Sequence, residues 1–239
     1  MNGTGIGDYG VKRIAVILAG GMGLRVGAGM PKQLIEVGGR PLLAYPIETF
    51  ASCPLIDEVI VVMASGFVAR AEELAAGHRV IEGGDTRTAS TLKALDLLAE
   101  ESDETVVLFH DAARAFVDHA VIGRCLKALE SYESVAVALP VTDTIVAVRD
   151  GQVADMPPRG GLVRFQTPQG FRLGTLRRGY EQALADPSFA ATDDCGVVHR
   201  YVPDVPIAIV EGDERLLKVT TALDLVVAEH FALTYRGSL

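Results

Sequence analysis

The chain has 239 residues, with 22 Lys or Arg against 31 Asp or Glu, and its formal net charge is -9. This acidic balance argues against a broad nucleic-acid surface, although it leaves room for a small basic pocket that binds a phosphorylated substrate. The length suits one large α/β domain with its own hydrophobic core, so we expect a single domain over residues 1–239.

Short apolar runs rich in Val and Ile predict buried strands at residues 14–18, 59–63, 105–109, 135–139 and 207–210. Between most of them lie stretches with helical spacing, including residues 87–98 and 121–129. Alternation of strands and helices is typical of βαβ units. We therefore expect an α/β fold with a doubly wound, mainly parallel sheet.

Residues 141–168 depart from that alternation. Two short strand-like runs, 144–148 and 152–155, flank Asp150-Gly151, a pair typical of tight hairpin turns, and a Pro/Gly-rich passage follows. We predict that 141–168 includes a β-arm that projects from the domain. Because an isolated two-stranded hairpin is marginal in water, we expect the arm to pair with a second subunit in a homodimer.

The three cysteines, Cys53, Cys125 and Cys195, are far apart, lack paired metal-ligand spacing and leave an odd thiol in any disulfide scheme. Residues 1–12 are Gly-rich and polar and lack the apolar region of a signal peptide, and no later apolar run approaches the ~20 residues of a membrane span. We expect a soluble, cytoplasmic protein without a membrane partner.

The first candidate site is a Gly-rich turn after the first predicted strand. Gly20, Gly21 and Gly23 would let backbone N–H groups approach phosphates closely. A valine stands where the dinucleotide fingerprint needs its third glycine, and the Gly-Lys-Ser/Thr of a P-loop is missing. Arg25 and Lys32 follow, and the combination suits nucleotidyl transfer, where the protein positions two anions and stabilises a highly charged transition state. The alternative is a common Gly-rich turn with two solvated cations.

A second polar cluster, residues 83–90, joins a predicted strand to a predicted helix and includes Gly84, Asp85 and Ser90. Helix N-termini bind anions and polar ligands. The alternative is simply a capped helix, with Asp85 or Thr86 as the cap.

A third cluster, His-Asp-Ala-Ala-Arg at 110–114, follows the predicted strand that ends at residue 109. Ligands of open α/β sheets sit at the carboxyl ends of strands, so Asp111 could face a nucleotide or its magnesium, and Arg114 could bind a second phosphate. The alternative is an ion pair between these two residues. His110 has no partner at metal-site spacing and is not assigned as a base.

Seven segments of this kind stand in order along the chain, at residues 18–33, 83–87, 110–114, 140–144, 166–171, 192–194 and 218–220. Together they resemble the 2-C-methyl-D-erythritol 4-phosphate cytidylyltransferase family, and the resemblance covers nearly the whole chain. It implies a nucleotidyltransferase-like fold and an enzyme that makes 4-CDP-2-C-methyl-D-erythritol and pyrophosphate from CTP and 2-C-methyl-D-erythritol 4-phosphate in isoprenoid biosynthesis.

The resemblance also implies roles for individual residues. The catalytic cations would be Arg25, Lys32, Arg159 and Lys218. The CTP site would be formed by Ala19, Gly20, Gly21, Gly23, Gly84, Asp85 and Ser90, with Asp111 beside them. The acceptor would be held by Arg114, Thr144, Arg159 and Thr192. In this family the arm arginine, here Arg159, comes from the neighbouring subunit, so the dimer would complete the active site.

Magnesium is the expected cofactor and would be held mainly by the CTP phosphates, with Asp111 as the one plausible protein ligand besides Asp85. A dedicated protein metal site is not expected.

Three alternatives stay open. D-Ribitol 5-phosphate is the rival acceptor, because Gly20, Leu24, Ala115 and Leu216 depart from the commonest family pattern and the Gly-rich turn is also similar to that of ribitol-5-phosphate cytidylyltransferases. A guanylyltransferase of the molybdenum cofactor type would share the Gly-rich start but would not be expected to carry His-Asp-Ala-Ala-Arg. An inactive nucleotide-binding regulatory protein would keep the fold and is expected to have lost one of the catalytic cations.

Overall fold

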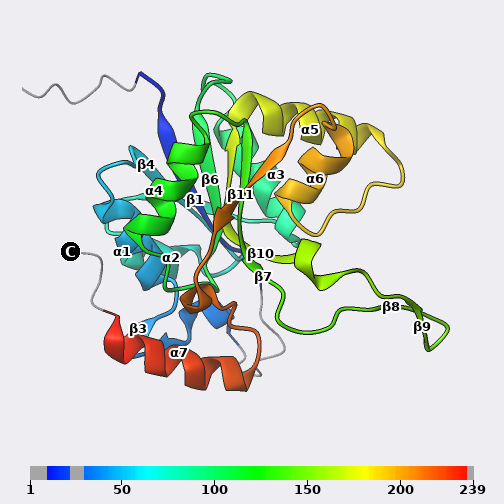
Figure 1. Cartoon of the computed structure of the whole chain (residues 1–239). Helices are drawn as coiled ribbons and strands as arrows, with labels where there is room; N and C mark the ends of the chain where they lie inside the picture. The colour runs from blue at the N-terminus through cyan, green and yellow to red at the C-terminus, as the bar shows by residue number, and fades with distance from the viewer. Residues whose placement is uncertain (1–9, 22–29, 236–239) are drawn as a thin grey trace, which may run out of the picture.

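The computed structural model describes residues 10–21 and 30–235, and a seven-stranded sheet lies at its centre (Figure 1). The strand order is β11-β7-β10-β6-β1-β4-β5. The strands are β1 (Arg13–Ala19), β4 (Glu58–Met63), β5 (Arg79–Glu82), β6 (Val106–Asp111), β7 (Ser134–Pro140), β10 (Val163–Arg172) and β11 (Ile207–Glu211). Only β10 runs antiparallel to its neighbours, β6 and β7, among these described strands. The predicted mainly parallel sheet is confirmed.

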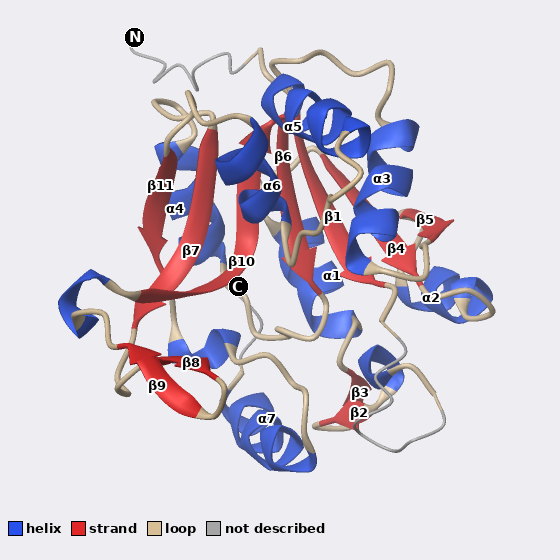
Figure 2. Cartoon of the chain, turned by 90° about the vertical axis from the view of Figure 1, so that its right-hand side faces the viewer, coloured by secondary structure: helices blue, strands red, loops and turns tan. Residues whose placement is uncertain are grey.

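Helices cover both faces of the sheet (Figure 2). They are α1 (Ala44–Ser52), α2 (Val68–Leu74), α3 (Arg87–Leu97), α4 (His119–Ala128), α5 (Leu173–Ala185) and α6 (Asp194–Tyr201). Successive side chains of β1 point to opposite faces, so Ala15 and Ile17 join the core under α1, α2 and α4, whereas Ile14 and Val16 join the core under α3, α5 and α6. This is the doubly wound arrangement expected from the sequence.

The five predicted strands and the two predicted helices are present, and residues 163–168, at the end of the passage that includes the arm, belong to strand β10 of the central sheet. The sheet register shifts between Phe165 and Gln169, and Pro168 lies within this irregularity. A proline, which lacks an N–H group, is tolerated at such an interruption of the ladder. The segment therefore pairs in the central sheet although its sequence does not look like a strand.

The predicted hairpin turn is confirmed in the arm. Strands β8 (Ala147–Arg149) and β9 (Gln152–Asp155) pair antiparallel and extend away from the sheet (Figure 1). Asp150 and Gly151 both have positive φ, 50° and 75°, as a tight turn that matches strand twist requires.

The C-terminal helix α7 (Ala222–Thr234) lies beside the small sheet of β2 (Glu36–Val37) and β3 (Arg40–Pro41). Val37, Phe116, Val219 and Ala228 pack together there. A capping box formed by the residues at 221 and 224 fixes the start of α7. This packing brings the segment before α7 next to the segment after the Gly-rich turn. No helix among residues 10–21 and 30–235 is long and apolar enough to cross a bilayer.

Candidate active site

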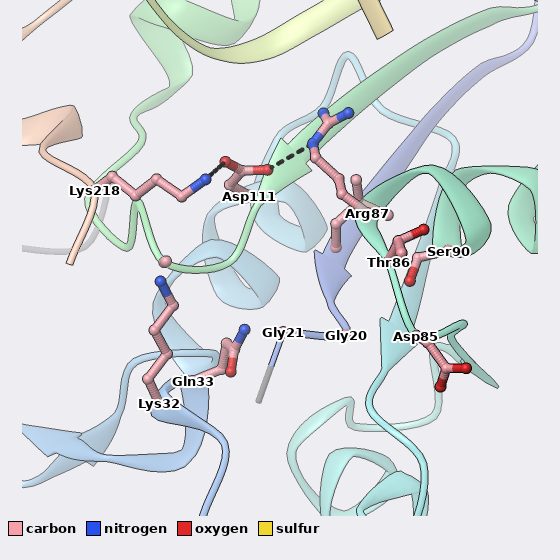
Figure 3. Close-up of a pocket in the computed structure, with 12 residues that line it drawn as sticks. Gly20, Gly21, Lys32, Gln33, Asp85, Thr86, Arg87, Ser90, Asp111 and Lys218 are labelled. Atoms are coloured by element: carbon pink, nitrogen blue, oxygen red, sulfur yellow. Dashed lines mark hydrogen bonds and ion pairs between the residues drawn. The ribbon is translucent and has the colours of Figure 1, made fainter. Parts of the chain in front are cut away.

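A pocket opens where β1 and β6 end and where α3 begins (Figure 3). Five separate parts of the chain contribute to it. Its lining residues are Leu18, Gly20, Gly21, Lys32, Gln33, Asp85, Thr86, Arg87, Ser90, Asp111, Ala113 and Lys218. The structure thus brings together seven residues singled out in the sequence, and it places the pocket at the strand ends where ligands of α/β sheets bind.

Small residues are required where the Gly-rich turn meets the start of α3. A Cβ at Gly20 would lie 2.7 Å from Ser90 Oγ, and a Cβ at Gly84 would lie 2.3 Å from the Cβ of Ala89. The N–H of Gly84 donates to Ser90 Oγ at 3.2 Å, which ties the preceding loop to the helix. Thr86 is the helix cap and accepts from the N–H of Ala89 at 3.0 Å, so the capped-helix interpretation is correct at this residue.

Two lysines approach the pocket from opposite ends of the chain. Lys32, in a short 3-10 helix (Lys32–Leu34), is buried, and its Nζ donates to the carbonyl of Val219 at 2.8 Å. Lys218 Nζ donates to Asp111 Oδ2 at 2.7 Å. Because Val219 is adjacent to Lys218, the same short segment positions both ammonium groups.

Asp111 lies between two cations, Lys218 and Arg87, whose Nε is 3.3 Å from Asp111 Oδ1. Burial alone would raise the pKa of Asp111, but the two cations outweigh burial and hold this pKa well below its ordinary value. The side chain is therefore an anion at neutral pH. The alternative of an Asp111–Arg114 ion pair is wrong, because the Arg114 guanidinium donates instead to the carbonyls of Leu216 at 2.7 Å and Phe165 at 3.3 Å.

His110 organises the backbone of this strand end rather than serving as a base. Burial lowers its pKa to about 4, so the ring is neutral. Its Nε2 is 3.0 Å from the Arg114 carbonyl and must carry the proton, so Nδ1 accepts from the Thr167 hydroxyl at 3.1 Å. The same hydroxyl accepts from the N–H of Asp111 at 3.0 Å. This chain fixes the backbone on both sides of the site carboxylate.

A second, wider pocket adjoins the first and shares Lys218 with it. Its lining residues are Arg114, Arg164, Phe165, Gln166, Glu214, Leu217, Lys218, Val227 and Phe231. The Nε atom of Arg114 is buried and has no hydrogen-bond partner in the described part of the chain. This pocket therefore offers cationic groups beside the first one.

The remaining predicted site residues are not gathered in these pockets. Arg159 is exposed on the arm and donates to the carbonyl of Thr142 at 2.8 Å, and Thr144 is exposed on the same arm. Thr192 is exposed just before α6, and Ala19 is fully buried at the end of β1. Gly23 and Arg25 lie outside the described residues.

Comparison with known proteins gives the family. The model of the family "2-C-methyl-D-erythritol 4-phosphate cytidylyltransferase" matches residues 13–234. This chain belongs to that family. It is 44% identical over 226 residues to a protein of that name from Thermobifida fusca, covering 90% of this chain and 91% of that one. The predicted family, and with it nucleotidyltransferase chemistry in isoprenoid biosynthesis, is confirmed.

Solved structures agree with the fold. The crystal structure of 4-diphosphocytidyl-2C-methyl-D-erythritol synthase from Anaerococcus prevotii superposes with a TM-score of 0.82 at 29% identity, covering 95% of this chain and all of that one. The cytidylyltransferase from Thermus thermophilus gives 0.74 at 33% identity, covering 91% and 98% of the two chains. A relative with another name is a bifunctional ribulose 5-phosphate reductase/CDP-ribitol pyrophosphorylase of Haemophilus influenzae, 35% identical over 93% of this chain and 50% of its own length.

Sequence reasoning missed Arg87, Gln33 and Thr86 as lining residues. Each stands inside a segment that carried the family resemblance, so the segments were informative but the individual side chains were not singled out. Arg87 Nη1 also lies 2.8 Å from Asp194 Oδ2. This contact joins the first residues of α3 and α6, which are far apart in the sequence, so the spacing of neighbouring residues could not predict it.

Proposed function

We propose that this chain transfers CMP from CTP to 2-C-methyl-D-erythritol 4-phosphate and releases pyrophosphate. The observation that supports this reaction is the meeting of a glycine-lined cradle with two lysines, Lys32 and Lys218, in one pocket at the strand ends. The cradle fits a nucleotide, and the lysines supply positive charge where a triphosphate and an acceptor phosphate would meet.

In this proposal the cytidine lies against Gly20, Gly84 and Ser90, where the Gly-rich turn and the loop at Gly84 pack closely on the start of α3 and backbone groups can approach the base. An oxygen of the acceptor phosphate attacks the α-phosphorus, a new P–O bond forms, and the bond from the α-phosphorus to the bridging oxygen of pyrophosphate breaks. The protein supplies no nucleophile. It orients the two anions and stabilises the charge that builds up between them.

Lys32 and Arg25 are proposed to stabilise the transition state at the α-phosphate, and Lys218 to orient the acceptor phosphate with Arg114. The Val219 carbonyl fixes Lys32 Nζ, and burial of this lysine strengthens its interaction with phosphate because little water competes. Lys218 lines both pockets, which suits a residue between nucleotide and acceptor.

Magnesium is proposed to enter with CTP. No group of three or more His, Cys, Asp or Glu side chains among residues 10–21 and 30–235 could hold a metal ion by itself. Asp111 offers one carboxylate at the pocket, and Asp85 a second at its rim, which fits an ion held mainly by triphosphate oxygens. When bound, such an ion neutralises phosphate charge.

We propose a homodimer in which the arm of one subunit completes the site of the other. Arg159 and Thr144 line neither of the two pockets described above. The arm also carries exposed apolar side chains, with Val148 63% and Val153 61% exposed, which a partner would cover. A cytoplasmic location is proposed because Cys53, Cys125 and Cys195 are all unpaired thiols.

D-Ribitol 5-phosphate is a second candidate acceptor, and the Haemophilus influenzae relative named as a CDP-ribitol pyrophosphorylase supports it. Purified protein with Mg·CTP and each acceptor at matched concentration decides between them by pyrophosphate release. We expect strong preference for 2-C-methyl-D-erythritol 4-phosphate and loss of release in Lys32→Ala. A preference for D-ribitol 5-phosphate would make that compound the acceptor. CTP binding without pyrophosphate release with either acceptor would indicate an inactive nucleotide-binding protein.

A further inference from the structure

A line of alternating charges runs from the protein interior to the pocket. Asp194, the first residue of α6, is 0% exposed and accepts a hydrogen bond from the Tyr180 hydroxyl at 2.6 Å. Arg87 Nη1 is 2.8 Å from Asp194 Oδ2, and Arg87 Nε is 3.3 Å from Asp111 Oδ1. Asp111 Oδ2 in turn binds Lys218 Nζ at 2.7 Å, and Figure 3 shows Asp111 between the two cations.

We propose that Arg87 is a positioning residue for the transfer reaction: anchored by Asp194, it fixes the carboxylate of Asp111 and, through it, the ammonium group of Lys218. This inference rests on the proposed function of the pocket. The reaction steps proposed above use neither Arg87 nor Asp194, and the inference gives this buried ion pair a role in positioning Lys218.

The geometry of a guanidinium group suits this task. Its planar fork presents N–H donors in fixed directions, so Arg87 can bind a carboxylate on each side at once, which a lysine ammonium on a flexible stem cannot do with the same rigidity. Burial alone would lower the pKa of Arg87, but the two carboxylates outweigh burial and raise it, so the group stays charged. Arg87 Nη2 and Asp194 Oδ2 are buried and have no hydrogen-bond partner among the described residues, so the 2.8 Å contact between Arg87 Nη1 and Asp194 Oδ2 is an ion pair. Arg87 lines the first pocket, but its Nε and Nη1 face Asp111 and Asp194 and its Nη2 is buried, so the proposal has it act on the pocket through Asp111.

The places of Arg87, Asp111 and Asp194 in the fold explain how the position of one side chain fixes that of the next. Arg87 is the first residue of α3, Asp111 is the last residue of β6, and Asp194 follows the cap of α6, Asp193, which accepts from the N–H of Gly196 at 2.8 Å. Three elements distant in sequence are thus locked at one point.

Lys218 is the most exposed of these four residues. Its side chain is 41% exposed, and its one ion pair within the described ranges is with Asp111. If the Asp111 carboxylate rotates, Lys218 Nζ loses this ion pair and is no longer held at the place where nucleotide and acceptor are proposed to meet.

Arg87→Lys tests the proposal because it keeps the charge but cannot bridge two carboxylates. We expect kcat/KM to fall about 30-fold, within the range of about 10- to 100-fold seen when groups behind a functional residue are changed. The loss should shrink to less than about 3-fold when Arg87→Lys is made in an Asp111→Asn background, because the residue through which Arg87 acts is already altered. The same fold loss in both backgrounds would overturn the proposal, since it would mean that Arg87 contacts the substrate directly.

Arg177→Lys is the matched control for the general effect of shortening a partly buried arginine. Arg177 also joins a carboxylate, that of Asp103 at 2.6 Å, and a backbone carbonyl, that of Ala99 at 3.0 Å, but lies outside both pockets. We expect its kcat/KM to stay within about 2-fold of wild type. Should Arg87→Lys fail to fold, Asp194→Asn removes the anchor instead, and the same loss and the same coupling to Asp111→Asn are expected.

A readout without turnover separates this inference from the proposed function. Crystal structures of wild type and Arg87→Lys should show the Asp111 carboxylate rotated and Lys218 Nζ beyond hydrogen-bond distance from it in the variant. An unchanged Asp111–Lys218 pair would overturn the positioning role. A wild-type protein that releases no pyrophosphate would instead refute the proposed function, and the two structures would still decide what Arg87 holds.

Discussion

Gly84 is a position at which the structure predicts a large effect of one added methyl group. An alanine Cβ there would lie 2.3 Å from the Cβ of Ala89 and 3.0 Å from the carbonyl carbon of that residue. To reach an ordinary contact of about 3.4 Å, the loop and the first turn of α3 must move apart by about 1 Å. That turn carries Ser90, so the movement displaces the cradle proposed for cytidine. A displacement of about 1 Å near a reacting centre costs on the order of 100-fold in rate.

The assay is pyrophosphate release with Mg·CTP and 2-C-methyl-D-erythritol 4-phosphate, compared as kcat/KM for CTP. Gly84→Ala should lose about 100-fold, whereas the matched control Gly123→Ala should keep wild-type activity, because a Cβ at Gly123 in α4 meets nothing within 4 Å. Retention of activity within about 3-fold in Gly84→Ala, with both variants folded, would refute the assignment of this junction to the nucleotide.

Two further predictions concern His110 and the arm. His110 has its pKa lowered to about 4 from 6.5 by burial, so the unfolded chain binds a proton more readily between these pH values, and the free energy of unfolding should fall as pH drops through this window, by up to about 3 kcal/mol from this group. In urea unfolding, the difference in the free energy of unfolding between wild type and His110→Gln should become smaller from pH 7 to pH 4. A difference that does not change with pH would contradict a neutral, buried His110 ring. For the arm, a 1:1 mixture of Arg159→Ala and Lys32→Ala subunits should regain about a quarter of wild-type activity, because half of the dimers are mixed and each mixed dimer has one intact site. Absence of rescue in verified mixed dimers would place Arg159 in its own subunit's site.

The sheet could be predicted because its strands are buried on both faces and so read as continuous apolar runs. Residues 14–18 and 59–63 are examples, and both became parallel strands next to each other. The hairpin turn was equally readable, because Asp150-Gly151 has the backbone freedom that positive φ requires. In these places the local sequence and the fold agree.

The sequence was less informative where tertiary contacts decide the outcome. Strand β10 contains Pro168 and a register shift, and it is held as a strand by its two neighbours rather than by its own propensity. β5 is a short edge strand of four partly exposed residues, too weak a pattern to predict. Both strands form because they pair with strands that are far away in the sequence.

In the candidate site, too, some residues could be predicted from local sequence patterns and others could not. The glycines and the lysines that meet in the pocket belong to segments with clear local patterns, so they could be named in advance. The partners of Asp111 could not, because Arg114 is near it in sequence whereas Arg87 and Lys218 reach it only through the fold. Distance along the chain, rather than residue type, limited the prediction.

The most direct test of transfer at the α-phosphorus is a ³¹P NMR spectrum of the complete reaction with CTP, magnesium and 2-C-methyl-D-erythritol 4-phosphate. Attack at the α-phosphorus predicts two coupled resonances of a new CDP-linked diphosphate together with free pyrophosphate, in equal amounts. CDP accumulating with a newly phosphorylated acceptor would show transfer of the γ-phosphate instead and would contradict the account.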